Sequence, residues 1–234
     1  MNTIDVCLSP DLIHKYNLSG KIVVIVDILR ATSCITTGLA VGVKSIVPVV
    51  SLEKCKEMKS EGFFIAGERG GQKVDGFDIG NSPFSYMEPR FKGSNIAITT
   101  TNGTVAIEKS ADADLIIIGS FLNISAVAMY VMKFNLDVIV FCAGWKGRVS
   151  IEDTLFAGAL AEKLEVSYES ADDSVLLSKS LYQKEKNNLL QYVENAGHAK
   201  RLRKFNVIKD IEFCLSMDTY NVVPVIKNGV IQLA

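Results

Sequence analysis

The sequence has almost no net charge and no long apolar run. Its 234 residues carry 25 lysines and arginines against 26 aspartates and glutamates, so no basic surface recommends nucleic acid as a partner. No stretch approaches the roughly 18 apolar residues that a membrane-spanning helix needs. The first residues, MNTIDVCL, lack the charged start and apolar core of a signal peptide. We therefore expect a cytoplasmic enzyme or binding protein, with neither nucleic acid nor membrane as a partner.

Cysteine and histidine are also scarce. The five cysteines stand at irregular spacing without a CxxC pair, which argues against a disulfide framework or a structural zinc site. Free cysteine mostly behaves as a small buried hydrophobe. Only His14 and His198 are available as bases, and both stand in unremarkable contexts. A Cys–His nucleophile pair is therefore not expected.

Several motifs of phosphate and ester chemistry are absent. There is no GxxxxGK[ST] phosphate loop, no GxGxxG dinucleotide turn and no GxSxG nucleophile elbow. The DxDxT signature of the haloacid-dehalogenase-type phosphatases is missing too, because Leu29 stands where its second aspartate would be. The chemistry of this chain must therefore come from other patterns.

Four apolar runs each end in a polar, glycine-containing cluster. They are KIVVIVDILRATS (21–33), FFIAGERGG (63–71), IAITTTNGT (96–104) and VIVFCAGWKGRVSIED (138–153). In open α/β sheets, ligands bind in the crevice beyond the carboxyl ends of the strands. If the four runs are neighbouring strands, one pocket gathers Asp27, Arg30, Glu68, Arg69, Thr101, Asn102, Arg148, Glu152 and Asp153. Carboxylates for a metal beside arginines for an anion indicate chemistry on a phosphorylated small molecule.

The rest of the pattern predicts an α/β fold. Residues 22–26 are five consecutive β-branched residues, typical of a strand buried on both faces. Further strands are expected at 3–8, 45–50, 63–66, 96–100, 115–118 and 138–141, and helices at about 31–40, 51–59, 104 onward, 126–134, 151–164, 170–195 and 208–215. Residues 67–89 are predicted as one long loop, and 222–233 as a hairpin with a type I′ turn at Asn228-Gly229.

These elements favour a layered α/β/α arrangement with a mixed, largely parallel sheet and a C-terminal hairpin. We take residues 1–234 as one domain, with a separable C-terminal lobe after about residue 170 as the alternative.

Asp27 follows a buried strand, a position that suits a ligand of Mg²⁺, which takes oxygen donors and usually one or two carboxylates. The simpler alternative is a carboxylate that caps the next helix or pairs with Arg30. Arg30 itself offers a planar fork for two phosphate or sulfonate oxygens. Thr32 and Ser33 could add hydroxyl and N–H donors at the helix start.

Glu68 and Arg69 repeat this combination between glycines, with an exposed ion pair in a turn as the alternative reading. Hydroxyls and an amide also stand at a strand-to-helix turn, where N–H groups and the helix dipole can bind phosphate. The residues of that turn are Thr101, Asn102, Gly103 and Thr104.

The densest cluster contains Gly144, Arg148, Glu152 and Asp153. Ser150 followed by Asp153 partly fits a capping box, which explains Asp153 but neither Arg148 nor Glu152. Two adjacent acids at a helix start could instead hold a metal.

Five ordered motifs together resemble the 2-phosphosulfolactate phosphatase family: DILRATS (27–33), GERGG (67–71), GFDIGNSP (76–83), TTNGT (100–104) and CAGWKGRVSIED (142–153). DIEFC (210–214) and DTYNVVPV (218–225) are similar to its C-terminal region. The resemblance implies a magnesium-dependent phosphatase that hydrolyses 2-phospho-3-sulfolactate to 3-sulfolactate and phosphate, a step toward coenzyme M, on a family-specific α/β fold.

The expected roles follow from the clusters and the resemblance together. Mg²⁺ would be held by Asp27 with Glu68 or with the Glu152–Asp153 pair. Anion binding and catalysis would involve Arg30, Arg69 and Arg148, and the phosphoryl oxygens would contact Thr101, Asn102 and Thr104, with Thr32, Ser33, Gly103 and Gly144 beside the substrate. Asp27 could be a metal ligand or a covalent nucleophile.

Two alternatives stay open. The chain could be a phosphatase of another phosphorylated 2-hydroxy acid, or a non-catalytic anion-binding protein. A homodimer is expected from general frequency alone.

Overall fold

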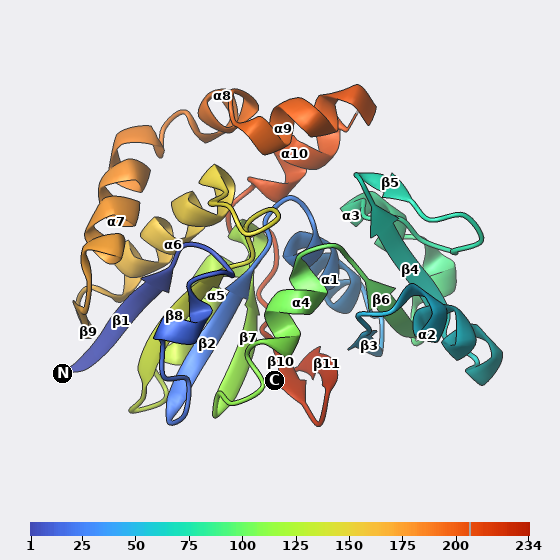
Figure 1. The fold of residues 1–234 in the computed structure, drawn as a ribbon, viewed down its shortest axis with the longest axis horizontal. Coiled ribbons are helices and arrows are strands. Elements are labelled where there is room, and N and C mark those ends of the chain that lie inside the picture. Colours follow the sequence, from blue (N-terminus) through green and yellow to red (C-terminus); the bar gives the residue numbers. More distant parts are fainter. Residues whose placement is uncertain (206) are drawn as a thin grey trace.

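The computed structural model describes residues 1–205 and 207–234, which form an α/β fold around a mixed sheet (Figure 1). The strands are β1 (Asn2–Cys7), β2 (Lys21–Val26), β3 (Ser45–Pro48), β4 (Phe64–Arg69), β5 (Gln72–Lys73), β6 (Asn95–Thr99), β7 (Leu115–Gly119), β8 (Asp137–Cys142), β9 (Tyr168–Ser170), β10 (Pro224–Lys227) and β11 (Val230–Leu233). The α-helices are α1 (Ala31–Ala40), α2 (Leu52–Glu57), α3 (Pro83–Tyr86), α4 (Gly103–Glu108), α5 (Ile124–Val131), α6 (Ile151–Leu164), α7 (Asp173–Glu185), α8 (Leu189–Glu194), α9 (Gly197–Leu202) and α10 (Ile208–Cys214).

Strand β2 shows why the sheet lies between two layers. Its side chains alternate, as the pleat of a strand requires. Ile22, Val24 and Val26 join one buried core with helices α5, α6 and α7, whereas Val23 and Ile25 join a second core with α1 and α4. The predicted α/β/α layering, with a strand buried on both faces, is therefore confirmed.

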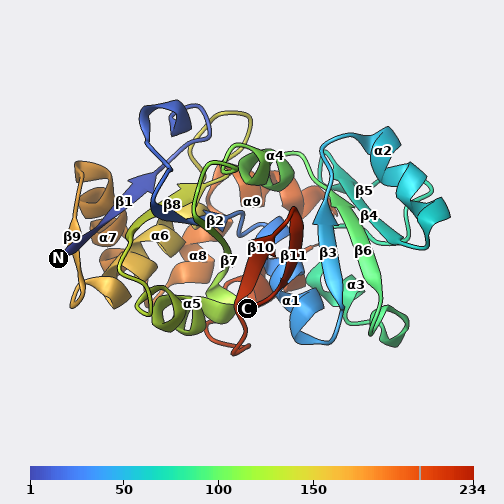
Figure 2. The ribbon, with the colours of Figure 1, turned by 90° about the horizontal axis from the view of Figure 1, so that it is seen from below.

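The C-terminal hairpin lies in the middle of the sheet. The strand order is β5-β4-β6-β3-β11-β10-β7-β2-β8-β1-β9, and Figure 2 shows β10 and β11 between β7 and β3. Asn228 and Gly229 both have positive φ, 52° and 77°, as a type I′ turn requires. Val225 pairs with Ile117 and Ile231 with Ile46, all antiparallel. The hairpin thus joins two largely parallel half-sheets.

This order corrects one expectation. The four strands that lead into the polar clusters are not all neighbours: β4 pairs with β6 and β2 pairs with β8, but four strands separate the two pairs. The clusters therefore come from strand ends that are not all adjacent in the sheet.

Some local predictions were wrong or incomplete. The predicted loop 67–89 contains the end of β4, strand β5 and helix α3. Strand β9, which pairs with β1, and helix α9 were not predicted. The predicted helical character of 170–195 is confirmed, and it is divided between α7 and α8.

Two further findings concern the class of protein. The five cysteines are buried and free. Within the part of the chain that the structure describes, no helix combines the length and apolar character required to cross a bilayer. The assignment of residues 1–234 to one domain stays a prediction.

Candidate active site

A cavity of about 310 Å³, which we call the strand-end cavity, lies beyond β2, β4 and β6 and beneath α9. In Figure 1 the C-terminal helices α8 to α10 run across the top of the molecule, above these strand ends. Its lining comprises Asp27, Leu29, Arg30, Glu68, Arg69, Gly70, Gly71, Asn81, Thr101, Asn102, Trp145, Lys146, His198, Arg201, Leu202 and Phe205. Six predicted site residues therefore meet here, although they come from different half-sheets.

Asp27 follows β2 directly and its side chain is buried. Its backbone is fixed by Thr32, whose hydroxyl donates to the Asp27 carbonyl at 3.0 Å, while the N–H of Ala31 donates to Oδ1 at 3.4 Å. Burial raises the pKa of Asp27 to about 6; the charge of His198 and the Ala31 bond lower it, and Glu68 and Glu152 raise it further. A carboxylate held in this way favours a bound cation, which would stabilise its ionised form.

Glu68 reaches the same cavity from the other half-sheet. It is the penultimate residue of β4, and the turn to β5 brings the N–H of Gly71 to 2.5 Å from its Oε1. The hydroxyl of Thr101 donates to its Oε2 at 3.4 Å. Each carboxylate oxygen has a second lone pair, so these contacts orient Glu68 and leave each oxygen able to accept a further bond or bind a cation.

Arg30 and Arg69 are fixed in different ways. The guanidinium of Arg30 forms a buried ion pair with Asp210 of α10, and its Nη2 donates to the carbonyl of Gly71 at 3.3 Å. Its buried Nε has no hydrogen-bond partner among the described residues. Arg69 donates to the Glu68 carbonyl at 2.7 Å and to the Thr99 hydroxyl at 3.0 Å.

The turn between β6 and α4 packs closely against Asp27. A Cβ on Gly103 would lie 2.8 Å from the Ala31 Cβ and 3.2 Å from Asp27 Oδ2, so this position requires glycine. Asn102 accepts a 3.4 Å bond from the N–H of Lys146, which ties this turn to the loop after β8.

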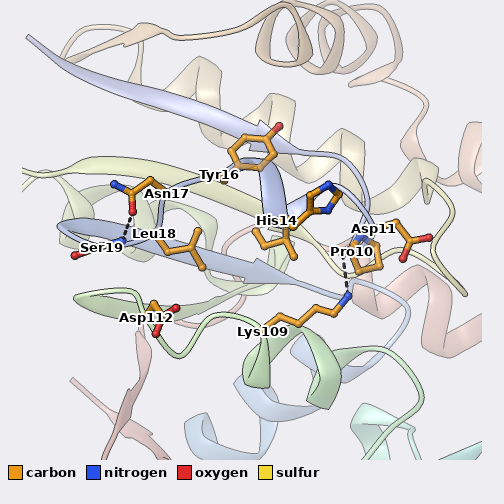
Figure 3. A pocket seen from close by; sticks show the side chains of 10 residues that line it. Pro10, Asp11, His14, Tyr16, Asn17, Leu18, Ser19, Lys109 and Asp112 are labelled. Atoms are coloured by element: carbon orange, nitrogen blue, oxygen red, sulfur yellow. Dashed lines mark hydrogen bonds between the residues drawn. The ribbon is translucent and has the colours of Figure 1, made fainter.

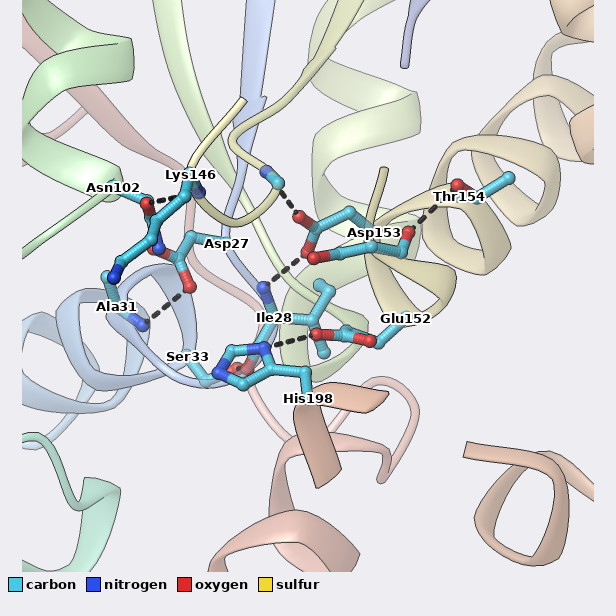
Figure 4. A network of polar contacts seen from close by, with 12 residues as sticks. Asp27, Ile28, Ala31, Ser33, Asn102, Lys146, Glu152, Asp153, Thr154 and His198 are labelled. Carbon is cyan, nitrogen blue, oxygen red and sulfur yellow. Dashed lines mark hydrogen bonds and ion pairs between the residues drawn. The ribbon is translucent and has the colours of Figure 1, made fainter. Parts of the chain in front are cut away.

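Asp153 braces two loops instead of facing the cavity. Its Oδ1 accepts from the N–H of Ile28 at 2.9 Å and its Oδ2 from the N–H of Gly144 at 3.0 Å (Figure 4). Burial and the charges of Glu152 and Asp27 raise its pKa, and the two N–H donors oppose this. The structure thus gives Asp153 a backbone-binding position, away from the cavity lining where a metal ligand was expected.

Glu152 and His198 form an unpredicted pair. Nδ1 of His198 lies 2.6 Å from Oε1 of the buried Glu152, and in Figure 4 the imidazole ring lies between Glu152 and Asp27. Oε2 of Glu152 is buried without a partner among the described residues. Glu152 therefore orients a histidine that lines the cavity, and its expected direct place at a metal is not supported by this geometry.

Several other predicted residues lie outside the cavity. Arg148 is exposed and lines a smaller hollow of about 120 Å³ together with Glu152 and Arg201. Thr32, Ser33 and Thr104 are buried, and each donates its hydroxyl to a backbone carbonyl of its own helix start. Gly144 has φ +57° and closes the loop after β8. These four residues shape the backbone near the cavity and do not line it.

A wider hollow of about 900 Å³ lies elsewhere, between residues 10–19 and the end of α4 (Figure 3). Lys109 donates there to the Pro10 carbonyl at 3.0 Å. None of the predicted site residues lines this hollow, so the smaller strand-end cavity is the candidate site.

The sequence model of the 2-phosphosulpholactate phosphatase family matches residues 7–229. The chain belongs to this family. A probable 2-phosphosulfolactate phosphatase of Caldanaerobacter subterraneus subsp. tengcongensis is 43% identical over 226 residues, which cover 94% of this chain and 93% of the relative. The corresponding protein of Thermotoga maritima is 41% identical over 207 residues, with 88% and 89% covered. That of Clostridium tetani is 36% identical over 236 residues, with 98% and 99% covered.

The resemblance found in the motifs is therefore confirmed, and the relatives are phosphoric monoester hydrolases by name, the class of enzyme expected from the sequence. The cavity of this family member also contains ten residues that the sequence analysis did not predict as site residues: Leu29, Gly70, Gly71, Asn81, Trp145, Lys146, His198, Arg201, Leu202 and Phe205. The local sequence around His198, NAGHAK, carries no motif that predicts a site. The one signal in the sequence is the number of histidines: the chain has only two, and phosphoryl transfer often uses a histidine.

The metal that the family resemblance implies can be tested against the donors. Among the described residues, no three His, Cys, Asp or Glu side chains are placed to hold one ion. Mg²⁺ usually needs only one or two protein carboxylates and keeps several waters. Asp27 and Glu68 supply two carboxylates at one cavity, and Asn81 adds a buried amide oxygen without a partner among the described residues. An all-oxygen donor set of this kind fits Mg²⁺.

Proposed function

We propose that this protein hydrolyses the phosphate monoester of 2-phospho-3-sulfolactate, releasing 3-sulfolactate and phosphate, with Mg²⁺ as its metal. The observation that carries the proposal is the meeting of Asp27 and Glu68, from separate half-sheets, with Arg30 and Arg69 in one cavity. Acids and arginines at one site suit a cation and an anionic ester together. The family membership and the names of the relatives support the substrate.

Asp27 and Glu68 would hold the metal. When bound, Mg²⁺ would supply charge neutralisation for the phosphate group, an effect that contributes much of the catalysis of phosphoryl transfer. The raised pKa of Asp27, about 6, agrees with this assignment, because a buried carboxylate of this kind gains from a nearby cation.

Arg30 and Arg69 would bind the phosphate. Arg30 is held by Asp210, so its fork is oriented before substrate arrives, and its Nε still has an unused proton. Thr101 and Asn102 would add a hydroxyl and an amide at the start of α4. Preorganised donors cost no reorganisation during the reaction.

His198 would act as the general acid. The leaving group is the alkoxide of a 2-hydroxy acid, which is poor unless it is protonated as the P–O bond breaks. Glu152 holds Nδ1 of the ring and stabilises the imidazolium, so Nε2 can donate its proton to the leaving oxygen. General acids of this kind typically contribute about 10²- to 10⁴-fold.

The test is phosphate release by the purified full chain from 2-phospho-3-sulfolactate, with Mg²⁺ and with EDTA, beside a panel of other phosphomonoesters. We expect Mg²⁺-dependent release, abolished in Asp27→Asn and retained in Asp112→Asn, because Asp112 is an exposed acid that does not line the cavity. If phosphate is released from a different phosphorylated 2-hydroxy acid and not from 2-phospho-3-sulfolactate, the proposed substrate is wrong. Tight binding without release at saturating Mg²⁺ would indicate an anion-binding protein.

A further inference from the structure

Among the described residues, Arg201 is the arginine of the cavity that forms neither an ion pair nor a hydrogen bond. It lies on α9 and lines both the strand-end cavity and the neighbouring hollow that contains Arg148. Its guanidinium carbon lies 3.7 Å from the centroid of the Trp145 ring, close enough for a stacked cation–π contact. Stacking holds the plane of the guanidinium while leaving its edge, where the N–H donors are, free.

The two other arginines of the cavity, and Arg203 beside it in the chain, are engaged. Arg30 pairs with Asp210, Arg69 donates to a backbone carbonyl and a hydroxyl, and Arg203 pairs with Glu194 at 3.2 Å. For Arg201, residues 1–205 and 207–234 provide no carboxylate within ion-pair distance and no hydrogen-bond acceptor. Glu152 attracts it only at longer range, and burial lowers the pKa of Arg201. A guanidinium remains charged under such conditions, so its donors are available to a ligand.

A second cation approaches the same ring. Nζ of Lys146 lies 4.8 Å from the Trp145 centroid, and Lys146 also lines the cavity. Its backbone is tied to Asn102 by the 3.4 Å bond drawn in Figure 4. Two like charges gathered at one aromatic ring repel each other, and an oxyanion that contacts both relieves this repulsion.

The charged residues of the cavity form two sets. Asp27 and Glu68 lie at the strand ends, with Arg30 and Arg69 beside them. Arg201 and Lys146 lie at the Trp145 side. A ligand with a phosphate alone would use only the first set. A ligand with an additional oxyanion would use both.

We propose that Arg201, supported by Trp145 and Lys146, binds the second anionic group of the substrate, a carboxylate or sulfonate, and so selects phosphorylated acids over simple phosphate esters. This rests on the proposed function for the reaction, and it adds a specificity-determining residue. Arg201 contacts the part of the substrate that does not react, so its removal weakens binding of that part and leaves phosphoryl transfer itself in place.

Four esters separate the two candidate groups: 2-phospho-3-sulfolactate, 2-phospholactate with the carboxylate alone, 2-phosphoethanesulfonate with the sulfonate alone, and isopropyl phosphate with neither. The variants are Arg201→Met, which keeps the length that packs on Trp145, and Arg201→Lys, which keeps the charge. Arg203→Gln is the matched control, because Arg203 follows on the same segment but lines neither hollow.

In Arg201→Met we expect KM for 2-phospho-3-sulfolactate to rise about 10- to 100-fold, the loss typical of a hydrogen bond to a charged group, with kcat nearly unchanged. The kcat/KM for isopropyl phosphate should change less than about threefold, and Arg201→Lys should recover part of the loss. The single-anion ester whose KM rises identifies the bound group. Arg203→Gln should match the parent protein on all four esters.

An equal loss on isopropyl phosphate, or no loss on the acids, would overturn the role of Arg201. If the parent protein releases phosphate from 2-phospholactate but not from 2-phospho-3-sulfolactate, the proposed substrate fails while the Arg201 comparison can still be read. If it hydrolyses none of the four, binding of 3-sulfolactate and lactate by calorimetry, in parent and Arg201→Met, decides the inference: equal affinities would refute it.

Discussion

The strand-end cavity has two walls of different origin. One wall is formed by the turns after β2, β4 and β6, and it carries Asp27, Glu68 and Thr101, each held by bonds from its own or an adjoining turn. The other wall is helical: α9 and the following 3₁₀ turn (Arg203–Phe205) carry His198, Arg201 and Phe205. The strand-end wall presents carboxylates with Arg30 and Arg69 beside them, whereas the helical wall presents a histidine and an arginine but no carboxylate.

The difference teaches where precision and selectivity come from. The groups that we propose as metal ligands are attached to the ends of parallel strands, whose hydrogen bonds fix them within a small range. The group that we propose to meet the variable part of the substrate is attached to the short helix α9, which is held by packing and by a few polar contacts, such as that between His198 and Glu152.

Removing the proposed metal ligand of the strand-end wall should have the largest effect. Asp27→Asn should lower kcat by about 10³-fold or more, because the charge that anchors the cation at the reacting phosphate is lost. A phosphate-release assay would measure the loss of kcat, and calorimetric titration with Mg²⁺ would measure the loss of metal binding. Circular dichroism would check that the variant is folded. Retained Mg²⁺-dependent turnover would rule out this role for Asp27.

Breaking the buried ion pair between Arg30 of the strand-end wall and Asp210 of α10 should mainly affect stability. Asp210→Ala leaves Arg30 buried without its carboxylate and should destabilise the protein by about 3–5 kcal/mol in urea unfolding. The exposed Arg90–Glu88 pair is the control, and Glu88→Ala should cost less than about 1 kcal/mol. Equal costs for the two variants would mean that burial of the Arg30 pair does not matter.

The helical wall can be tested through the leaving group. His198→Gln should lower kcat by about 10²-fold on 2-phospho-3-sulfolactate, where the alkoxide needs a proton. On p-nitrophenyl phosphate, whose phenolate leaves without protonation, the loss should be much smaller. His14→Gln, in the other hollow, is the matched control. A uniform loss on both esters would assign His198 to positioning, not proton transfer.

The strand-end wall should also have a measurable pH dependence. Because the folded-state pKa of Asp27 is raised from 3.8 to about 6, the folded protein binds more protons than the unfolded chain between these values, and stability falls as pH rises through this window. Asp27→Asn removes this loss. In EDTA this variant should be about 3 kcal/mol more stable than the parent protein at pH 7.5, and the difference should shrink towards pH 4. A difference independent of pH would contradict the shift.

The contact between the walls can be tested at two adjacent glycines. Gly71 and Gly70 both have positive φ, +93° and +65°, but a Cβ on Gly71 would lie 2.7 Å from the Phe205 ring, whereas one on Gly70 would meet nothing within 4 Å. Each alanine variant should lose about 1 kcal/mol from backbone strain. Gly71→Ala should also raise KM about tenfold, because Phe205 must move. Equal KM values would show that the helical wall tolerates the displacement.

Much of the fold could be predicted from local patterns in the sequence. The run of β-branched residues at 22–26 predicted a doubly buried strand, and Asn228-Gly229 predicted the type I′ hairpin, because both signals depend on neighbouring residues. Strand β9 and helix α9 were missed, since the first is three residues long and the second carries no cap or clear apolar period. The order of strands was missed because pairing of β11 with β3 and of β10 with β7 depends on packing between distant segments.

The sequence by itself determined which residues end the strands, and hence that Asp27, Arg30, Glu68, Arg69, Thr101 and Asn102 would stand at strand ends with acids beside arginines. Only the tertiary structure decided that Asp153 binds backbone N–H groups, that Arg148 points to solvent, and that Glu152 holds His198 against the cavity. The reason is physical: a strand end is set by local hydrogen bonding and burial pattern, whereas a contact across 46 residues is set by how whole helices pack.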